Sequence, residues 1–189
     1  MNKLDIFKTL PEEFRIATKE DLPLVTLTLA QAFTDYKYPI PTVEVSYSAL
    51  LKFNYKISEV CTINAMENGA VLSNEDFSAV ILVTEYAKRA DYNVDLLYDN
   101  LKENAGIVAA ENMLSILNYI CNEESKLNID DKTYFIDMFA VQTPRQGQKL
   151  GSKLMRELFR QCKEINRDVF FIQIQRRMKV YIITLVLKQ

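Results

Sequence analysis

The sequence contains no histidine, so the side chain that most often serves as a general acid, a general base or a metal ligand is missing. A Ser-His-Asp triad and a histidine zinc site are therefore excluded. The three cysteines, Cys61, Cys121 and Cys162, lie far apart and form no C-x-x-C pair, which argues against a disulfide framework or a thiolate metal site. We predict no metal site, and we expect each thiol to be a small buried apolar group, because no histidine is present to activate it.

Long apolar runs are missing as well. No apolar stretch approaches the roughly 18 residues that span a bilayer, and residues 1–10 mix acidic and basic side chains instead of forming a signal sequence. Together with the cysteine pattern, this predicts a soluble, cytoplasmic protein without a membrane partner. Glycine and proline are scarce, at 4 and 5 residues, whereas 49% of the chain is hydrophobic, so we expect a single globular domain over residues 1–189.

Acidic residues are scarce in the last quarter of the chain. Residues 145–189 hold 11 Lys and Arg but only 3 Asp and Glu, whereas residues 1–144 hold 12 and 22. Such a basic segment indicates a bound anion, either a phosphate-bearing cofactor or nucleic acid, although solvated lysines on a helix would give the same count. The segment has no helix-turn-helix or RNA-recognition signature, so we predict no nucleic-acid partner.

The spacing of apolar residues predicts an α/β (α+β) fold with a mixed sheet. Short β-branched or apolar runs predict strands at residues 14–16, 70–72, 78–84, 133–141, 169–174 and 182–187. Helical spacing predicts helices at about 22–36, 43–59, 94–125 with a break at Gly106, and 148–165, with one further helical turn over 176–180. Thr18 and Asp21 have capping-box spacing before the first of these helices.

One loop holds two of the four glycines. Gly147 and Gly151 lie between the strand at 133–141 and the most strongly periodic helix. Glycine lets backbone N–H groups approach a ligand closely, and the N-terminus of the following helix adds unpaired donors and the positive end of a dipole. Arg145, Lys149 and Lys153 add positive charge at the same place. The loop therefore predicts a phosphate-binding site; the alternative is that this glycine spacing only lets the helix pack closely on the sheet.

The loop matches neither a Walker loop nor a dinucleotide fingerprint. Residues 141–155, Val-Gln-Thr-Pro-Arg-Gln-Gly-Gln-Lys-Leu-Gly-Ser-Lys-Leu-Met, instead resemble the acetyl-CoA motif of the GNAT superfamily of N-acyltransferases, Gln/Arg-x-x-Gly-x-Gly/Ala after a strand that ends in Val. Gln146 stands at the first position of the motif and Gly151 at the last, whereas Lys149 stands where the family usually has its middle glycine. Residues 14–22 resemble the opening strand and helix start of the family.

The resemblance implies the GNAT fold, a mixed, mostly antiparallel central sheet flanked by helices, with the helical region near 94–125 as an insertion. In the family, the strand before the loop splays from its neighbour, and acetyl-CoA binds along that strand and the loop. The resemblance therefore places the acetyl and pantetheine groups on Phe139, Ala140 and Val141. It places the pyrophosphate on the backbone amides of Gln146, Gly147, Gln148, Lys149, Leu150, Gly151 and Ser152.

The resemblance also implies catalysis by direct attack of an amine on the thioester, without histidine. Tyr181 resembles the tyrosine of the family's last helix, which commonly protonates the leaving thiolate; an amphipathic core tyrosine is the alternative. We predict Asp137 as the base, because residues 137, 139 and 141 of a regular strand share one face. The alternative is an Asp137 paired with a Lys or Arg of a neighbouring strand, and Glu85 is a weaker candidate for the base.

The expected function is that of an acetyl-CoA-dependent N-acetyltransferase acting on a primary amine of a small molecule or peptide. The acidic remainder of the chain would attract such a cationic substrate. The alternative is a GNAT-like fold that binds acyl-CoA without turnover, as a sensor or an assembly module. An uncovered last strand would leave an exposed sheet edge, and a homodimer is one arrangement that would cover it.

Overall fold

The computed structural model of the protein describes residues 7, 9–35, 46–88, 94–175 and 179–185. Six strands form one sheet in the order β1 to β6, and every neighbouring pair is antiparallel except β4–β5. The strands are β1 Phe14–Ile16, β2 Gly69–Asn74, β3 Ala79–Glu85, β4 Tyr134–Val141, β5 Val169–Gln175 and β6 Lys179–Leu185. This confirms the predicted α/β class with a mixed, mostly antiparallel sheet.

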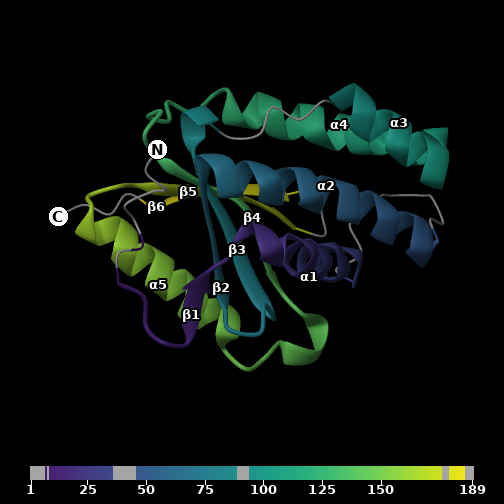
Figure 1. Ribbon diagram of the computed structural model, residues 1–189. Helices are drawn as coiled ribbons and strands as arrows, with labels where there is room; N and C mark the ends of the chain where they lie inside the picture. The colour runs from purple at the N-terminus through teal and green to yellow at the C-terminus, as the bar shows by residue number, and fades with distance from the viewer. Residues whose placement is uncertain (1–6, 8, 36–45, 89–93, 176–178, 186–189) are drawn as a thin grey trace.

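Helices cover both faces of the sheet (Figure 1). They are α1 Leu22–Asp35, α2 Tyr47–Asn68, α3 Val94–Ala105, α4 Ile107–Glu124 and α5 Leu150–Glu164. Leu154, Leu158 and Cys162 of α5 pack on one face, against Ile81 and Val83 of β3. Residues of α1 and α2 pack on the opposite face, against Val80 and Leu82 of the same strand. We call these the α5 face and the α1/α2 face.

The start of α1 follows the predicted capping box. The backbone N–H and the hydroxyl of Thr18 both donate to Oδ2 of Asp21, at 2.8 and 3.1 Å. The same carboxylate accepts from Arg15 at 2.7 Å. A single 3-10 turn, Lys19–Asp21, then leads into α1. The local side-chain pattern is therefore sufficient to set where this helix begins.

Helix α2 is longer than predicted. Ser46 caps it by accepting from the backbone N–H of Ala49 at 3.2 Å, and the helix continues to Asn68 instead of ending near residue 59. It passes directly into β2 at Gly69, where a Cβ atom would lie 1.8 Å from the Val83 carbonyl oxygen. Tyr47, in the first turn of the helix, is 56% exposed, and its hydroxyl donates to Asp35 of α1 at 3.1 Å.

Helices α3 and α4 are the predicted insertion between β3 and β4, and Gly106 separates them with a φ of +90°. They pack on α2 through a small apolar cluster of their own, formed by Phe53 with Leu101, Ala109, Ala110 and Met113. No helix in the described ranges is long and apolar enough to cross a membrane.

One predicted element and the predicted burial of one cysteine are wrong. The helical turn over 176–180 is not formed at Lys179 and Val180, which belong to β6, while residues 176–178 lie outside the described ranges. The β-branched residues that follow Val180 favour the strand, which pairs with β5 along its whole length.

Cys61 and Cys162 are buried as predicted, and burial raises the pKa of the Cys162 thiol to about 12. Cys121, in contrast, is exposed on α4.

Candidate functional site

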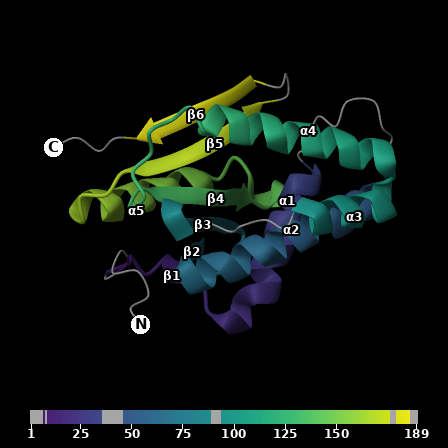
Figure 2. The ribbon, with the colours of Figure 1, turned by 90° about the horizontal axis from the view of Figure 1, so that it is seen from above.

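Strands β4 and β5 run parallel but separate almost at once. They pair only through Tyr134 with Val169 and Phe135 with Phe170. Figure 2 shows the two strands diverging beyond this point. From Ile136 to Val141, the edge of β4 that faces β5 therefore has no strand partner among the described residues. A gap with polar backbone groups along one side opens in the middle of the sheet, which is the splay expected from the resemblance.

The loop after β4 brings a helix N-terminus to the wide end of this gap. Gly147 has a φ of +80° and Lys149 a φ of +62°, and α5 begins at the next residue. The first bond of the helix is donated by Lys153 N–H to the Lys149 carbonyl oxygen, at 3.0 Å. No side chain caps the helix, so the N–H groups of its first turn remain available to an anion.

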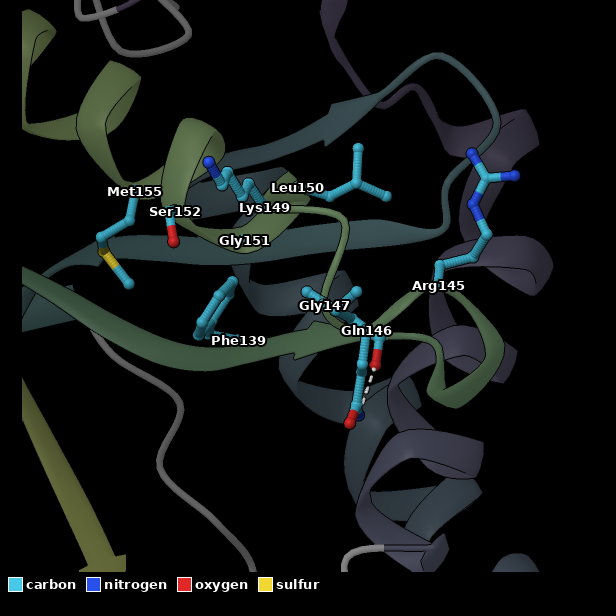
Figure 3. A pocket seen from close by; sticks show the side chains of 10 residues that line it. Phe139, Arg145, Gln146, Gly147, Lys149, Leu150, Gly151, Ser152 and Met155 are labelled. Carbon is cyan, nitrogen blue, oxygen red and sulfur yellow. Dashed lines mark hydrogen bonds between the residues drawn. The ribbon is translucent and has the colours of Figure 1, made fainter.

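A groove of about 490 Å³ lies between this helix start and the end of β4. Figure 3 shows Phe139 rising from β4 toward the first turn of α5. Eight of the ten predicted cofactor residues line the groove: Phe139, Val141, Gln146, Gly147, Lys149, Leu150, Gly151 and Ser152. Ala140 does not, because it alternates to the opposite face and packs in the α1/α2 core, and Gln148 is not among the lining residues either. Arg145 and Met155 also line the groove and are not among the predicted cofactor residues. Arg145 was expected only as a positive charge near the loop, and Met155 lies one turn beyond Gly151 on α5.

Side-chain hydrogen bonds fix the first part of the loop. Gln146 Nε2 donates to the Val141 carbonyl oxygen at 3.2 Å, as the dashed line in Figure 3 shows. Thr143 donates to Asp35 of α1 at 2.6 Å, and Gln142 donates to Thr28 of the same helix at 3.0 Å. The loop is thus positioned by α1 before any ligand arrives.

Arg145 is held on the far side of the loop. Its guanidinium lies 3.2 Å from Asp76 in the β2–β3 turn, and its side chain points away from the groove in Figure 3. Hydrogen bonds from Ser78 lower the pKa of Asp76, and Arg145 acts in the same direction, so the carboxylate stays charged. Lys149 has no ion-pair partner among the described residues and remains available at the groove.

The two loop glycines serve different purposes. A Cβ on Gly147 would meet open space, so its positive φ is the constraint there. A Cβ on Gly151 would lie 2.7 Å from Cζ of Phe139 and 3.0 Å from Val141. Close packing of α5 on β4 therefore accounts for Gly151, as the alternative interpretation of the glycine spacing proposed, while the uncapped amides beside it still face the groove.

The sequence of this region matches a known protein family. A family model described as "Acetyltransferase (GNAT) family" matches residues 75–177, which include the gap, the loop and α5. The chain belongs to the GNAT acetyltransferase family. A search of curated proteins finds no match. A solved structure that matches is the crystal structure of a mosquito arylalkylamine N-acetyltransferase like 5b, at 15% identity over 85% of this chain and 76% of that chain, with a TM-score of 0.42.

In this GNAT domain, Asp137 does not share a face with Phe139 and Val141. Val83 of β3 pairs with Ile136 and Leu82 with Met138, so Asp137 is the extra residue of a β-bulge. Ile136 consequently packs in the α5-face core together with Val141. The prediction of one common face is wrong, because a bulge shifts the alternation of a strand by one residue.

Asp137 instead faces the α1/α2 side. Its Oδ2 accepts a hydrogen bond of 2.7 Å from Thr84, which follows Val80 and Leu82 on the same face of β3. Asp137 is partly buried and lies two residues beyond the last β4–β5 pair. The candidate base is thus at the narrow end of the gap, on the face opposite to the groove.

Tyr181 lies in β6, where its backbone pairs with Gln173 of β5. The prediction that it belongs to a helix is therefore wrong, and β5 stands between its backbone and the gap. Glu85 ends β3 and its carboxylate lies 2.5 Å from the ammonium of Lys88. No group of acidic or cysteine side chains that could hold a metal ion occurs in the described part of the GNAT domain.

Proposed function

We propose that the protein is an N-acetyltransferase that uses acetyl-CoA to acetylate a primary amine. The observation that carries the proposal is the sheet gap between β4 and β5, which opens at the uncapped start of α5 within the region matched by the GNAT family model. A gap with one polar backbone edge, next to a cluster of free amides, suits a ligand with an amide-containing arm and a phosphate group.

The groove fits the parts of such a donor. The amides of the first turn of α5, with Gly147 before them, would hold the pyrophosphate, and Lys149 would add a positive charge. Phe139, Val141 and Met155 give the groove an apolar wall for the pantetheine methyl groups. The N–H and C=O groups on the edge of β4 that faces β5 would bond the two pantetheine amides, as an additional strand would.

The reaction forms one bond and breaks one. The amine nitrogen bonds to the thioester carbonyl carbon, the carbon–sulfur bond breaks, the nitrogen loses a proton and the CoA thiolate gains one. Asp137 is the proposed proton acceptor, oriented by Thr84 on the α1/α2 face. The acceptor amine then approaches from that face while the phosphates stay on the α5 face. Tyr181 remains the proposed proton donor to the thiolate.

The alternative, acyl-CoA binding without turnover, also has a supporting observation. Tyr181 lies in β6, a strand that pairs with β5, and not in a helix as the family's tyrosine does. A protein that binds CoA normally but releases no thiol with any amine in a broad panel would fit this alternative. Thiol release that falls by about 10²–10⁴ in Asp137→Asn, at unchanged donor affinity, would support the enzyme.

Calorimetric titration with CoA and acetyl-CoA tests the donor site directly. Ser152 is exposed, lines the groove and lies in the first turn of α5, where a carboxylate favours the helix. Ser152→Glu should therefore fold normally and weaken CoA binding by about tenfold or more, because like charges meet at the phosphate site. Ser115→Glu, the same change on an exposed residue of α4, should bind CoA as the wild type does. Equal binding by both variants would contradict the assignment of the groove.

A further inference from the structure

The narrow end of the gap is closed by three aromatic rings. Phe135 and Phe170, the last residues that pair β4 with β5, have ring centroids 5.6 Å apart. The ring of Tyr86 meets both edge-on, at centroid distances of 6.3 Å to Phe135 and 6.2 Å to Phe170. We call Tyr86, Phe135 and Phe170 the apex cluster.

The apex cluster is held firmly from several directions. The Tyr86 hydroxyl donates to Glu124 of α4 at 2.6 Å, and its backbone N–H donates to the Thr133 carbonyl oxygen at 2.8 Å. Phe170 is fully buried, and Glu124 is 4% exposed. Because these positions are fixed by backbone pairing and by a partly buried hydrogen bond, the rings form a rigid wall.

The apex cluster lies on the same face as the candidate base. Phe135 pairs with Thr84, the residue whose hydroxyl binds Asp137. Val169 packs in the α5-face core, so Phe170, its neighbour along β5, faces the opposite side. Phe135 therefore lies two residues before Asp137 on the same face of β4, on the side where the two strands meet.

The direction of the gap decides which part of an acyl donor reaches these rings. The groove for the phosphates lies at Val141, at the wide end, and β4 runs from there back to Phe135, at the apex. The distance from Val141 to Ile136 along the strand is roughly 17 Å at about 3.3 Å per residue. An arm anchored at the groove and extended along β4 thus presents its far end, the thioester and the acyl chain, to the apex cluster.

We infer that the apex cluster is the end wall of the acyl pocket and restricts the donor to short acyl groups, acetyl and propionyl. This inference rests on the proposed function, because it needs the donor to bind along β4. An acyl chain of four or more carbons would meet the rings, and a packed wall that has to move opposes each further methylene. Phe135 should determine the chain-length preference more than the other two residues. It belongs to β4, along which the donor is proposed to bind, and its side chain is only partly buried.

The experiment measures the dissociation constants of CoA, acetyl-CoA, propionyl-CoA, butyryl-CoA and hexanoyl-CoA by calorimetry, so that it does not depend on turnover. For the wild type we expect similar values up to propionyl-CoA and then a loss of roughly tenfold or more per added methylene. Phe135→Ala should restore butyryl-CoA and hexanoyl-CoA to within about threefold of acetyl-CoA. Phe135→Leu removes less volume and should give the same shift in smaller measure, which keeps the test valid if the alanine variant fails to fold.

Phe139→Ala is the matched control. It removes the same ring from the same strand, but at the groove end and on the α5 face, so it should weaken all five ligands by one common factor. Two outcomes would overturn the inference while leaving the proposed function intact. One is equal binding of acetyl-CoA and hexanoyl-CoA by the wild type. The other is a changed chain-length preference in Phe139→Ala together with an unchanged preference in the Phe135 variants. Failure of the wild type to bind CoA at all would overturn the proposed function and this inference with it.

Discussion

At the scale of single residues, Lys149 combines an unfavourable backbone conformation with a favourable charge. Its φ of +62° lies in the left-handed region, which costs a residue with a side chain about 1–2 kcal/mol. Lys149 lines the groove in which the phosphates are proposed to bind, so its ammonium can contribute a positive charge there (Figure 3). The family's usual glycine would avoid the conformational cost and lose the charge.

Lys149→Gly should therefore stabilise the protein and weaken the proposed ligand interaction. We expect the free energy of unfolding to rise by up to about 1 kcal/mol in urea denaturation, since glycine adopts positive φ freely. CoA affinity should fall and become less sensitive to salt. Lys102→Gly, at an exposed position with ordinary helical geometry in α3, should lower the unfolding free energy by about 1 kcal/mol. A loss of stability in both variants would show that the conformation of Lys149 is not strained.

Gly151 is coupled to Phe139 through space. Gly151→Ala brings a Cβ to about 2.7 Å from the ring, so the ring or the helix must shift, at a cost of about 1–3 kcal/mol. Phe139→Leu removes the atom that is closest. In a double-mutant cycle of unfolding free energies, the double variant should lose clearly less than the sum of the two single variants. Additive losses would mean that another contact, such as that with Val141, limits the site.

At the scale of elements, Gly106 determines how α3 and α4 meet. It has a φ of +90° with open space around the position of a Cβ, so only the backbone conformation requires glycine there. Gly106→Ala should cost about 1–3 kcal/mol of unfolding free energy, measured by urea denaturation. CoA binding should stay at the wild-type level, because the two helices pack on α2 and not on the groove. A variant as stable as the wild type would show that the two helices can meet in another geometry.

Elements defined by local signals were predictable from the sequence. The capping box of Thr18 and Asp21, the apolar run of β4 and the period of α5 each lie within one segment, and the structure confirms all three. Most of the groove was predictable for the same reason, since the loop motif is continuous in sequence.

Features that depend on two segments were not predictable. The bulge that turns Asp137 to the α1/α2 face exists only in the register between β3 and β4. The strand conformation of Val180 and Tyr181 depends on pairing with β5, and the apex cluster joins three segments that are far apart in sequence. Residue spacing along one strand carries no information about such pairings.

At the scale of the whole molecule, the donor site is also a discontinuity in the sheet. If the donor occupies it, CoA at 100 times its dissociation constant should add about 2.7 kcal/mol and raise the melting temperature by about 5–10 °C. Hydrogen exchange should slow at residues 136–141 and 147–152 and remain unchanged in α3 and α4. Protection spread evenly over the chain would contradict a ligand that binds along β4.

The two-residue junction between β4 and β5 also has a consequence for how the chain folds. Strands β1 to β4 pair with one another in antiparallel fashion. Strands β5 and β6 instead join the sheet through the short parallel pairing of β4 with β5, and along the chain α5 connects these two strands. Parallel contacts made across a crossover form late, because the chain loses the entropy of closing a long loop before these contacts stabilise it. We therefore expect a refolding intermediate in which β1–β4 are assembled and β4 still has a free edge, so that refolding yield should fall steeply with protein concentration.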